Sequence, residues 1–274
     1  MFEIIAKLEA FPVHVRVLPS VSDLAGGKVT ADDLQEVSIE DLLGRDTVAP
    51  NQKLLRKAIT GKVVAVTGAG GSIGSEICRQ IIILKPKRLV LYEMNELALF
   101  SVEKALSNLN TLHIDILPVL GSVNNEVRLN NIFKHFKVDT VYHAAAYKHV
   151  PMVEFNNTEG VNNNIFGTLS CAQAAIDSDV ETFVLISTDK AVRPTNTMGA
   201  TKRIAEMVLQ ALATKKSNTK FSIVRFGNVL DSSGSVIPLF REQIKNGGPV
   251  TVTNKAIIRY FMMISEAVEL VIQA

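Results

Sequence analysis

Apolar and polar positions change their spacing repeatedly between residues 61 and 226. Short runs rich in valine, isoleucine and leucine are followed by longer segments in which apolar residues recur every three or four positions. The runs predict buried strands, and the longer segments predict helices with one apolar face. The predicted strands are Lys62–Val66, Arg88–Tyr92, Asp115–Leu120, Thr140–His143, Thr182–Ser187 and Phe221–Phe226. The predicted helices are one that ends near Leu84, then Asn95–Asn108, Glu126–Phe136, one long helix that ends near Asp177, and Thr197–Leu212. This alternation predicts an α/β fold, a Rossmann-type doubly wound parallel sheet.

Residues 1–60 follow a different pattern and are predicted to form an N-terminal arm, the connecting segment or remnant of an upstream domain. Val13–Leu18 is predicted as a short strand, and Thr30–Leu43 combines an acidic run with scattered leucines and valines. Two apolar stripes this short could hardly form an independent core. The main domain is therefore expected at residues 61–274, with a small C-terminal substrate-binding part that begins near residue 228. Because the helical pattern of Ser265–Ala274 has no glycine or proline stop signal, we expect the chain to be cut there.

Glycines follow the first predicted strand at three-residue spacing, within Thr67-Gly-Ala-Gly-Gly-Ser-Ile-Gly74. Gly68 permits a tight turn, Gly71 lets the backbone approach a pyrophosphate, and Gly74 lets the next helix pack closely on the sheet. About 20 residues further on, Glu93 closes the second strand, where a carboxylate accepts both ribose hydroxyls and disfavours a 2′-phosphate. The stretch predicts a dinucleotide site that prefers NAD to NADP; the alternative is the same fold with an empty site. The predicted cofactor contacts here are Gly68, Gly71, Ser72, Ile73, Gly74 and Glu93.

Composition indicates a globular protein and excludes several classes of function. Apolar residues make up 47% and charged residues 20% of the chain, and the net charge of +2 comes from scattered lysines and arginines. This distribution argues against nucleic-acid binding. Cys78 and Cys171 lie on apolar helical patterns, which favours core packing in a reducing, cytoplasmic setting. The five histidines show no metal-ligand spacing, so no metal site is predicted. No apolar run is long enough to span a membrane in this chain.

Ligands of such sheets bind beyond the carboxyl ends of the strands, so the residues that follow each strand are candidates for a site. These candidates are Ser122 and Val123 against the adenine, Ala144, Ala145 and Ala146 against the nicotinamide, and Lys148 and His149 over the cleft. An ordinary turn, close packing of helix on sheet and surface exposure explain the same residues without a ligand. Asn164, in a helical pattern that contains three asparagines, is predicted to support the site or contact the substrate, with surface polarity as the alternative.

The fifth predicted strand is followed by Ser187-Thr-Asp-Lys190, the densest run of reactive side chains in the chain. Met198 and Lys202 come next and lie four residues apart on one helical face. A lysine on this helix can reach the nicotinamide ribose and bring positive charge to the reacting centre. A helix N-cap cluster would explain the serine, threonine and aspartate, but not a lysine at the mouth of the sheet.

Four stretches carry a family resemblance: the glycine stretch, His143-Ala-Ala-Ala-Tyr-Lys-His-Val-Pro151, Ser187–Lys190 and Arg225-Phe-Gly-Asn-Val-Leu230. Together they resemble the extended short-chain dehydrogenase/reductases. Within that superfamily they resemble the bacterial nucleotide-sugar 4,6-dehydratases of polysaccharide biosynthesis, which act on UDP-N-acetylglucosamine. The resemblance covers about Gly61–Ala274, and residues 18–50 resemble the connecting segment of the long, membrane-anchored members. The superfamily pairs a catalytic Tyr with the Lys four residues later, and here Met198 stands at the Tyr position. The long dehydratases are similar in having Met there, which implies that acid–base work has moved to the Thr-Asp-Lys run.

The resemblance implies a redox-neutral dehydration to a UDP-4-keto-6-deoxy-N-acetylhexosamine, in which a hydride passes from C4 of the sugar to NAD and returns to C6. It implies that Lys190 removes the C5 proton, that Asp189 protonates the leaving C6 oxygen, and that Thr188 orients the C4 hydroxyl. Met198 and Lys202 complete the predicted catalytic set, with Lys202 also a cofactor contact. Lys190 must be neutral for this role, and Asp189 must hold a proton, so its pKa should be raised.

Beyond the sixth strand, the resemblance implies that Asn228 contacts the sugar nucleotide and that Arg259 grips its diphosphate, with an ordinary surface charge as the alternative for Arg259. The predicted partners are a UDP-sugar and further copies of the chain, with the full-length protein at the cytoplasmic face of the bacterial inner membrane. Two other functions stay open: a UDP-N-acetylhexosamine 4-epimerase, which usually relies on the missing Tyr, and a catalytically inactive NAD-binding module.

Overall fold

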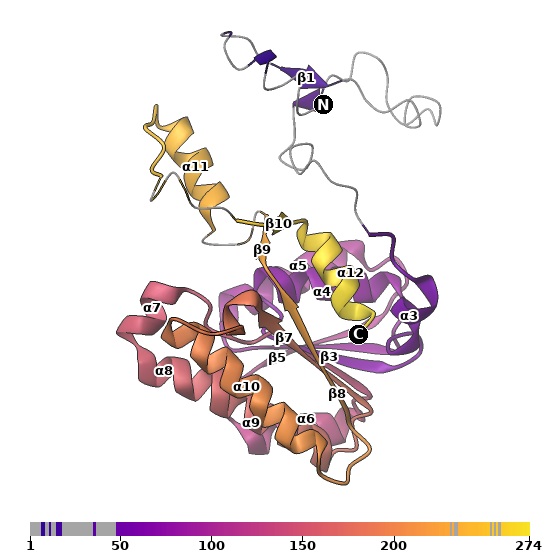
Figure 1. Cartoon of the computed structure of the whole chain (residues 1–274). Helices are drawn as coiled ribbons and strands as arrows, with labels where there is room; N and C mark the ends of the chain where they lie inside the picture. Colours follow the sequence, from indigo (N-terminus) through magenta and orange to yellow (C-terminus); the bar gives the residue numbers. More distant parts are fainter. Residues whose placement is uncertain are drawn as a thin grey trace.

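Six strands form a parallel sheet at the centre of the molecule (Figure 1). The computed structural model describes residues 7–8, 11, 15–17, 35–36, 48–230, 232, 235–252, 254, 256 and 259–274. The strands of the sheet are β3 (Val63–Thr67), β4 (Arg88–Glu93), β5 (Asp115–Leu120), β6 (Thr140–His143), β7 (Thr182–Thr188) and β8 (Lys220–Phe226). Their order is β5-β4-β3-β6-β7-β8, so the winding direction reverses between β3 and β6. This order confirms the predicted doubly wound α/β fold, and it puts the expected binding position beyond the carboxyl ends of β3 and β6.

Helices cover both faces of the sheet, which explains why its central strands are apolar on both sides. The helices are α3 (Gln52–Lys57), α4 (Ser72–Ile83), α5 (Glu96–Leu109), α6 (Glu126–Phe136), α7 (Val150–Phe155), α8 (Asn157–Val161), α9 (Gly167–Asp177), α10 (Thr197–Ala213), α11 (Val236–Lys245) and α12 (Ile264–Ile272). In β3, Val63 and Ala65 belong to a core built with α6, α9 and α10. Val64 and Val66 belong to a second core, built with α3, α4, α5 and α12. The sheet therefore separates two apolar cores and forms the rigid layer between them.

The single long helix predicted after His143 is wrong, because this segment consists of α7, α8, the π-helical turn η2 (Asn162–Phe166) and α9. Asn156 separates α7 from α8 with φ −128° and ψ 52°, outside the helical region. In η2, the side chain of Asn164 bonds to the backbone of Tyr147, and asparagines that find such partners weaken regular helix. The other predicted strands and helices of the sheet domain differ from the structure only at their ends.

Part of the predicted N-terminal arm is described. β1 (Arg16–Val17), inside the predicted strand Val13–Leu18, pairs in antiparallel fashion with β2 (Gln35–Glu36). Most of the acidic stretch Thr30–Leu43 lies outside the described residues. The boundary at residue 61 stays a prediction; α3 precedes it and packs Leu55 into the core of the sheet domain.

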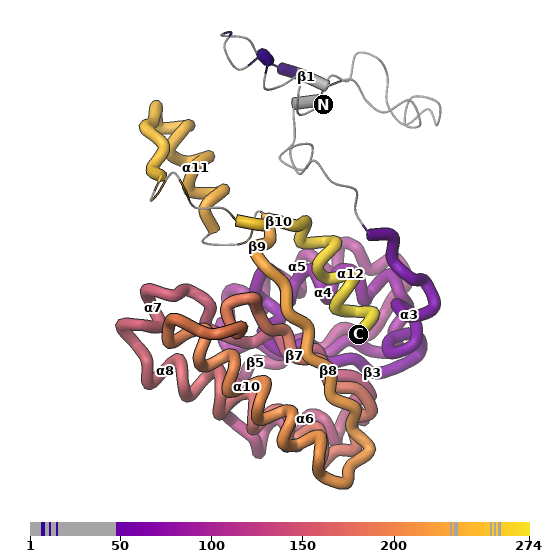
Figure 2. Tube along the Cα trace, in the orientation of Figure 1, coloured from indigo at the N-terminus to yellow at the C-terminus, as the bar shows by residue number. Residues whose placement is uncertain are grey.

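The C-terminal part leaves the sheet after β8. β9 (Asn228–Val229) and β10 (Phe261–Met262) form a short parallel pair, and α11 projects away from the sheet (Figure 1). The chain then returns, so that α12 packs against α4 and α3 from the first half of the sequence (Figure 2). Tyr142 in β6 also donates a hydrogen bond to the carbonyl oxygen of Ile272 in α12, at 3.3 Å. None of the described helices has both the length and the apolar character that a membrane crossing requires.

Candidate active site

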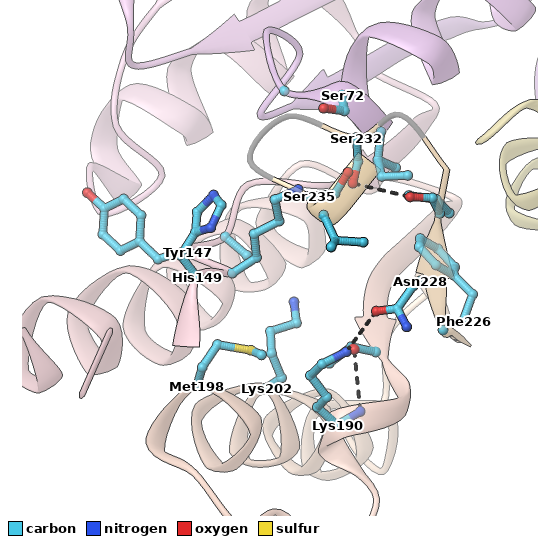
Figure 3. A pocket seen from close by; sticks show the side chains of 18 of the residues that line it. Ser72, Tyr147, His149, Lys190, Met198, Lys202, Phe226, Asn228, Ser232 and Ser235 are labelled. Atoms are coloured by element: carbon cyan, nitrogen blue, oxygen red, sulfur yellow. Dashed lines mark hydrogen bonds between the residues drawn. The ribbon is translucent and has the colours of Figure 1, made fainter. Parts of the chain in front are cut away.

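A cavity of about 1310 Å³ opens at the carboxyl ends of β3, β6, β7 and β8. Its walls come from the glycine turn after β3, the loop after β6, the end of β7, the start of α10 and the C-terminal part. In Figure 3, Ser72 lies on one wall, Met198 and Lys202 project from α10 on another, and Lys190 lies next to Asn228. Small-molecule pockets usually measure roughly 300–1,000 Å³, so this cavity has room for two adjoining ligands.

The glycine turn has no room for a side chain at Gly68 or Gly74. Gly68 has φ +67°, and a Cβ there would lie 2.6 Å from the backbone nitrogen of Ala145. A Cβ on Gly74 would lie 2.0 Å from the carbonyl oxygen of Gly68, far inside contact distance. At Gly71 the nearest atom would be 3.3 Å away, so the missing side chain there leaves space beside the helix. The geometry fits the roles expected of these glycines, which are a tight turn, close packing and room for a ligand at the backbone.

The N-terminus of α4 faces the cavity. Gly71 is its N-cap, and Ser72, Ile73 and Gly74 line the cavity from the first turn. That turn contains no acidic side chain, so no carboxylate of the helix offsets the positive end of its dipole. A helix start of this kind is suited to hold phosphate groups.

Glu93, the last residue of β4, ties this strand to the glycine turn. Its carboxylate accepts the N–H of Gly70 at 3.0 Å and the N–H groups of Met94 and Asn95 at 2.9 and 3.0 Å. The remaining lone pairs of the two oxygens are the ones that a ribose hydroxyl would use. Glu93 lies outside the cavity wall in the described residues, so its role toward a ribose stays a prediction.

The two predicted adenine contacts also lie outside the cavity wall. Val123 is 4% exposed and packs in the core beside α6 and α9, as a structural residue would. The carbonyl oxygen of Ser122 accepts the hydroxyl of Tyr92 at 2.9 Å, which fixes the turn after β5. Their contact with an adenine stays a prediction.

The loop after β6 lies directly against the glycine turn. Ala144 and Ala146 line the cavity, and Ala145 makes the close approach to Gly68 described above. Lys148 and His149 line the cavity beyond them, and burial lowers the pKa of Lys148. Small side chains here let the backbone of this loop and the glycine turn form one continuous wall.

Asn164 supports this loop from beneath and is not on the cavity wall, so its predicted contact with the substrate stays a prediction. It is fully buried, accepts the N–H of Tyr147 at 2.8 Å and donates to the carbonyl oxygen of Tyr147 at 3.0 Å. Its amide also donates to the hydroxyl of Thr201 on α10 at 3.0 Å. Asn164 therefore fixes Tyr147, and with it Lys148 and His149, relative to α10.

Thr188, Asp189 and Lys190 stand where β7 ends and the 3₁₀ turn η3 (Asp189–Ala191) begins. The ammonium of Lys190 donates to Asp189 Oδ1 at 3.1 Å and to Asn228 Oδ1 at 3.4 Å. The hydroxyl of Thr188 donates to the same carboxylate oxygen at 2.9 Å. Thr188 and Lys190 line the cavity, whereas Asp189 is not on its wall and is reached through its hydrogen bonds to these two residues.

The expected rise in the pKa of Asp189 is wrong for the ligand-free chain. Partial burial raises this pKa, but the hydrogen bonds from Thr188 and Lys190, together with the charge of Lys190, outweigh the effect of burial and lower the pKa overall. Asp189 is therefore a carboxylate paired with Lys190 when no ligand is bound. A protonated Asp189 requires that this pair be disturbed.

Lys202 lies at the bottom of the cavity beside Met198, with exposed fractions of 5% and 3%. Its ammonium donates to the carbonyl oxygen of Ile186 in β7 at 2.7 Å. Burial lowers the pKa of Lys202 to about 8, although the negative charge of Glu206 opposes part of this effect. Met198 offers no proton, whereas Lys202 and Lys190 line the same cavity and can carry one.

The C-terminal part closes the cavity on its remaining side. Asn228, Arg259 and Phe261 line the wall there, so both predicted substrate contacts of this part face the cavity. Asn228 follows β8 and meets Lys190 as described above. Arg259 precedes β10, whose pairing with β9 brings the arginine to the same wall as Asn228.

The residue pattern did not single out several groups that the structure brings to this site. Tyr147, Glu159 and Phe226 line the cavity. Glu206 lies behind it, fully buried and bonded to the end of β7. Its spacing of one helical turn from Lys202 was the available signal, but a partner on a neighbouring strand cannot be read from that spacing.

The chain has clear relatives in sequence. Residues 64–274 match the protein family described as "Polysaccharide biosynthesis protein". The chain is 50% identical to "Capsular polysaccharide biosynthesis protein CapD" of Staphylococcus aureus and to "Probable polysaccharide biosynthesis protein EpsC" of Bacillus subtilis (strain 168). Each match covers 96% of this chain and 44% of the relative, so the chain spans less than half the length of these proteins. It is also 35% identical to "UDP-glucose 4-epimerase" of Rickettsia typhi, over 78% of this chain and 62% of that protein.

Solved structures share the fold. "Pen" from Bacillus thuringiensis is 35% identical, covers 79% of this chain and 67% of its own, and superposes with a TM-score of 0.74. DesIV of Streptomyces venezuelae, titled as a dTDP-glucose 4,6-dehydratase with NAD and TYD bound, is 21% identical and superposes with a TM-score of 0.68. That match covers 77% of this chain and 72% of DesIV, and at this identity it shows the fold alone. The family match covers most of the sheet domain and the whole cavity wall, and the chain belongs to the polysaccharide biosynthesis protein family.

Proposed function

We propose that the chain carries the NAD-binding and catalytic part of a nucleotide-sugar 4,6-dehydratase. The reaction converts UDP-N-acetylglucosamine to a UDP-4-keto-6-deoxy-N-acetylhexosamine for a surface polysaccharide. The observation that carries this proposal is Lys190 on the cavity wall, in an ion pair with the adjacent Asp189, while Met198 on the same wall supplies no proton. A dehydration needs both a base for a carbon-bound proton and an acid for a leaving hydroxyl, and this pair offers one of each.

The glycine turn fits a dinucleotide. The clashes that a Cβ would make explain why glycine stands at Gly68 and Gly74, and Gly71 leaves the backbone accessible beside the start of α4. Glu93 stands at the end of the neighbouring strand, where it would accept a ribose hydroxyl. Bound NAD would supply a hydride acceptor for C4 and a hydride donor for C6, which keeps the overall reaction redox-neutral.

The residues at the end of β7 carry the proton chemistry. Lys190, once neutral, takes the proton from C5 of the sugar, and Asp189, once protonated, gives its proton to the C6 oxygen as it leaves as water. In the ligand-free chain Asp189 is a carboxylate, and the hydrogen bond of 3.1 Å from Lys190 gives a proton a direct path to it. Entry of the sugar between these groups and the solvent removes water from the ion pair and favours the neutral forms of both. Thr188, bonded to the same carboxylate, is positioned to orient the C4 hydroxyl, whose proton passes to solvent as the hydride leaves C4. When the hydride returns to C6, Lys190 gives a proton back to C5, so the product differs from the substrate by one water.

Positive and amide groups on the other walls suit the rest of the substrate. Lys202 holds charge at the bottom of the cavity, beside the expected position of the nicotinamide ribose. Lys148, His149 and Asn228 offer polar groups for the sugar, and Arg259 offers a guanidinium for the diphosphate.

The direct test is incubation of the chain with NAD and UDP-N-acetylglucosamine, followed by mass spectrometry. The proposal predicts a product lighter by one water, with no net change in NAD. Lys190→Ala should slow its formation by about 10²–10⁴-fold, the usual cost of losing a general base. A full-rate reaction in the Lys190→Ala variant would contradict the proposed role of the pair.

A 4-epimerase is the second candidate, because relatives 34–35% identical to this chain are named UDP-glucose 4-epimerases. It predicts an unchanged mass and a new UDP-N-acetylgalactosamine peak on chromatography. An inactive NAD-binding module predicts neither product, with thermal stabilisation by NAD but not by the UDP-sugar. Assembly into a homo-oligomer and a cytoplasmic location stay predictions, which light scattering and cell fractionation would measure.

A further inference from the structure

Glu206 is a buried acid that the proposed chemistry does not use. It lies on α10, one turn after Lys202, and its side chain is fully buried and absent from the cavity wall. Burying a carboxylate costs several kcal/mol unless partners compensate for its lost hydration. The hydrogen-bond partners of the Glu206 carboxylate must therefore offset the cost of its burial.

The partners of Glu206 come from two neighbouring strands and its own helix. Ser187 in β7 donates its hydroxyl to Oε1 at 2.6 Å. Arg225 in β8 donates Nε to Oε1 at 2.7 Å and a second, shorter hydrogen bond from Nη2 to Oε2. Arg203 on α10 donates to Oε2 at 3.0 Å. These hydrogen bonds and the charge of Arg225 outweigh the effect of burial and lower the pKa of Glu206 to about 2, so it is a carboxylate at neutral pH.

The two strand partners are themselves neighbours in the sheet. Ser187 and Arg225 are paired in the parallel register of β7 and β8. Glu206 thus joins the same rung of two strands to one helix, close to where both strands end. Lys202 adds a parallel link, because its ammonium bonds to the carbonyl oxygen of Ile186, the residue before Ser187.

The reactive side chains begin directly beyond this rung. Ser187 is followed by Thr188, Asp189 and Lys190, and Arg225 is followed at short distance by Asn228. Lys190 and Asn228 meet across the two strand ends at 3.4 Å, a long contact that a small relative movement of the strands would break. The separation of these two side chains therefore depends on how β7 and β8 are held together.

We propose that Glu206 is a positioning residue that clamps the carboxyl ends of β7 and β8 to α10 and so sets the approach of Lys190 to the sugar held by Asn228. This inference rests on the proposed dehydratase function. The carboxylate of Glu206 is suited to hold the two strands together, because its two oxygens can accept hydrogen bonds from Ser187 and from the guanidinium of Arg225 at once. A glutamine can satisfy only part of this set and leaves the guanidinium of Arg225 without its counter-charge.

The test compares Glu206→Gln with a matched control, Asp115→Asn, in the chain with NAD bound. Asp115 also pairs with an arginine that is its register partner on the next strand, Arg88, but at the amino ends of the strands. We expect kcat for dehydration to fall about 10–100-fold in Glu206→Gln, as a small misplacement of a reacting group would cause. The KM for the UDP-sugar and the Kd for NAD should stay within about threefold of the unaltered chain, and Glu206→Asp should recover part of kcat. Asp115→Asn should leave kcat unchanged.

An unchanged kcat in folded Glu206→Gln would overturn the inference, and so would an equal loss of kcat and NAD affinity, which a merely structural residue would give. If Glu206→Gln does not fold, Arg225→Lys keeps a counter-charge for the carboxylate but loses the two-point contact, at a residue that does not line the cavity, and it should still lower kcat more than it raises KM. A chain without any dehydratase activity would contradict the proposed function. Hydrogen–deuterium exchange in Glu206→Gln would then test separately whether Glu206 holds the two strand ends together. Faster exchange in both strand ends, residues 185–188 and 223–226, would support it, and unchanged exchange there would refute it.

Discussion

Replacing Gly74 by alanine tests whether the glycine turn owes its shape to close packing. The added Cβ would lie 2.0 Å from the carbonyl oxygen of Gly68 and 2.8 Å from its carbonyl carbon. Both are backbone atoms, so no side chain can rotate away. An ordinary contact begins near 3.4 Å, so α4 and the turn must separate by roughly 1.4 Å.

This movement must disturb the core beneath α4, because Ile77 and Ile81 on the same helix are fully buried. Overpacking of this kind costs about 1–3 kcal/mol, less up to about 1 kcal/mol that alanine regains over glycine inside a helix. For a chain of this size each kcal/mol lowers Tm by about 2–4 °C. The predicted loss is therefore a few degrees in Tm, together with a weakened response to NAD.

Gly71→Ala is the matched variant, because its Cβ would meet no atom closer than 3.3 Å. It should keep the Tm of the ligand-free chain and lose most of the stabilisation by NAD, since its methyl group occupies the space expected for the pyrophosphate. Differential scanning fluorimetry with and without NAD measures both quantities for both variants. A Gly74→Ala chain with unchanged Tm and an unchanged NAD response would refute the packing argument.

Three further predictions concern single side chains around the cavity. Burial lowers the pKa of Lys202 to about 8, so its ammonium loses its proton as the pH rises through that value. Calorimetry at a series of pH values should therefore show the affinity for NAD falling above pH 8. In Lys202→Met this pH dependence should vanish. Asp189→Asn keeps the shape of the side chain but cannot donate a carboxylic proton. In the water-loss assay kcat should therefore fall by about 10²–10⁴-fold, while the variant still binds the UDP-sugar. A variant with normal kcat would exclude Asp189 as the acid. Asn164→Ala leaves the backbone N–H and carbonyl of Tyr147 without their partner, so urea denaturation should show a loss of about 1–3 kcal/mol, and no loss would mean that water replaces the amide.

The sheet could be predicted from the sequence because its signals are local. The apolar runs of β3 and β7 are buried on both faces, and such runs are recognisable one at a time. The glycine spacing also identified the turn between β3 and α4, because the spacing itself is local, although the contact at Gly68 is with the distant Ala145.

The break in the helix after β6 could not be predicted in this way. Asn164 leaves regular helix for partners on Tyr147 and Thr201, and both partners are distant in the sequence. The prediction for Asp189 failed for a different reason: Thr188 and Lys190 adjoin it in sequence, but whether their groups bond to its carboxylate depends on the geometry of the folded turn. Glu206 escaped notice because its partners Ser187 and Arg225 meet only in the sheet. Residue types can suggest chemistry, but protonation states and supporting contacts depend on tertiary neighbours.

The central claim is that Lys190 exchanges a proton with C5 of a UDP-sugar during loss of water. The most direct measurement is the reaction of UDP-N-acetylglucosamine in D₂O, with the product analysed by mass spectrometry and NMR. Because the ammonium protons of Lys190 exchange with solvent, the claim predicts a 4-keto-6-deoxy product with one deuterium at C5, and almost no product from Lys190→Ala. A dehydrated product without deuterium at C5, or full activity in Lys190→Ala, would contradict it.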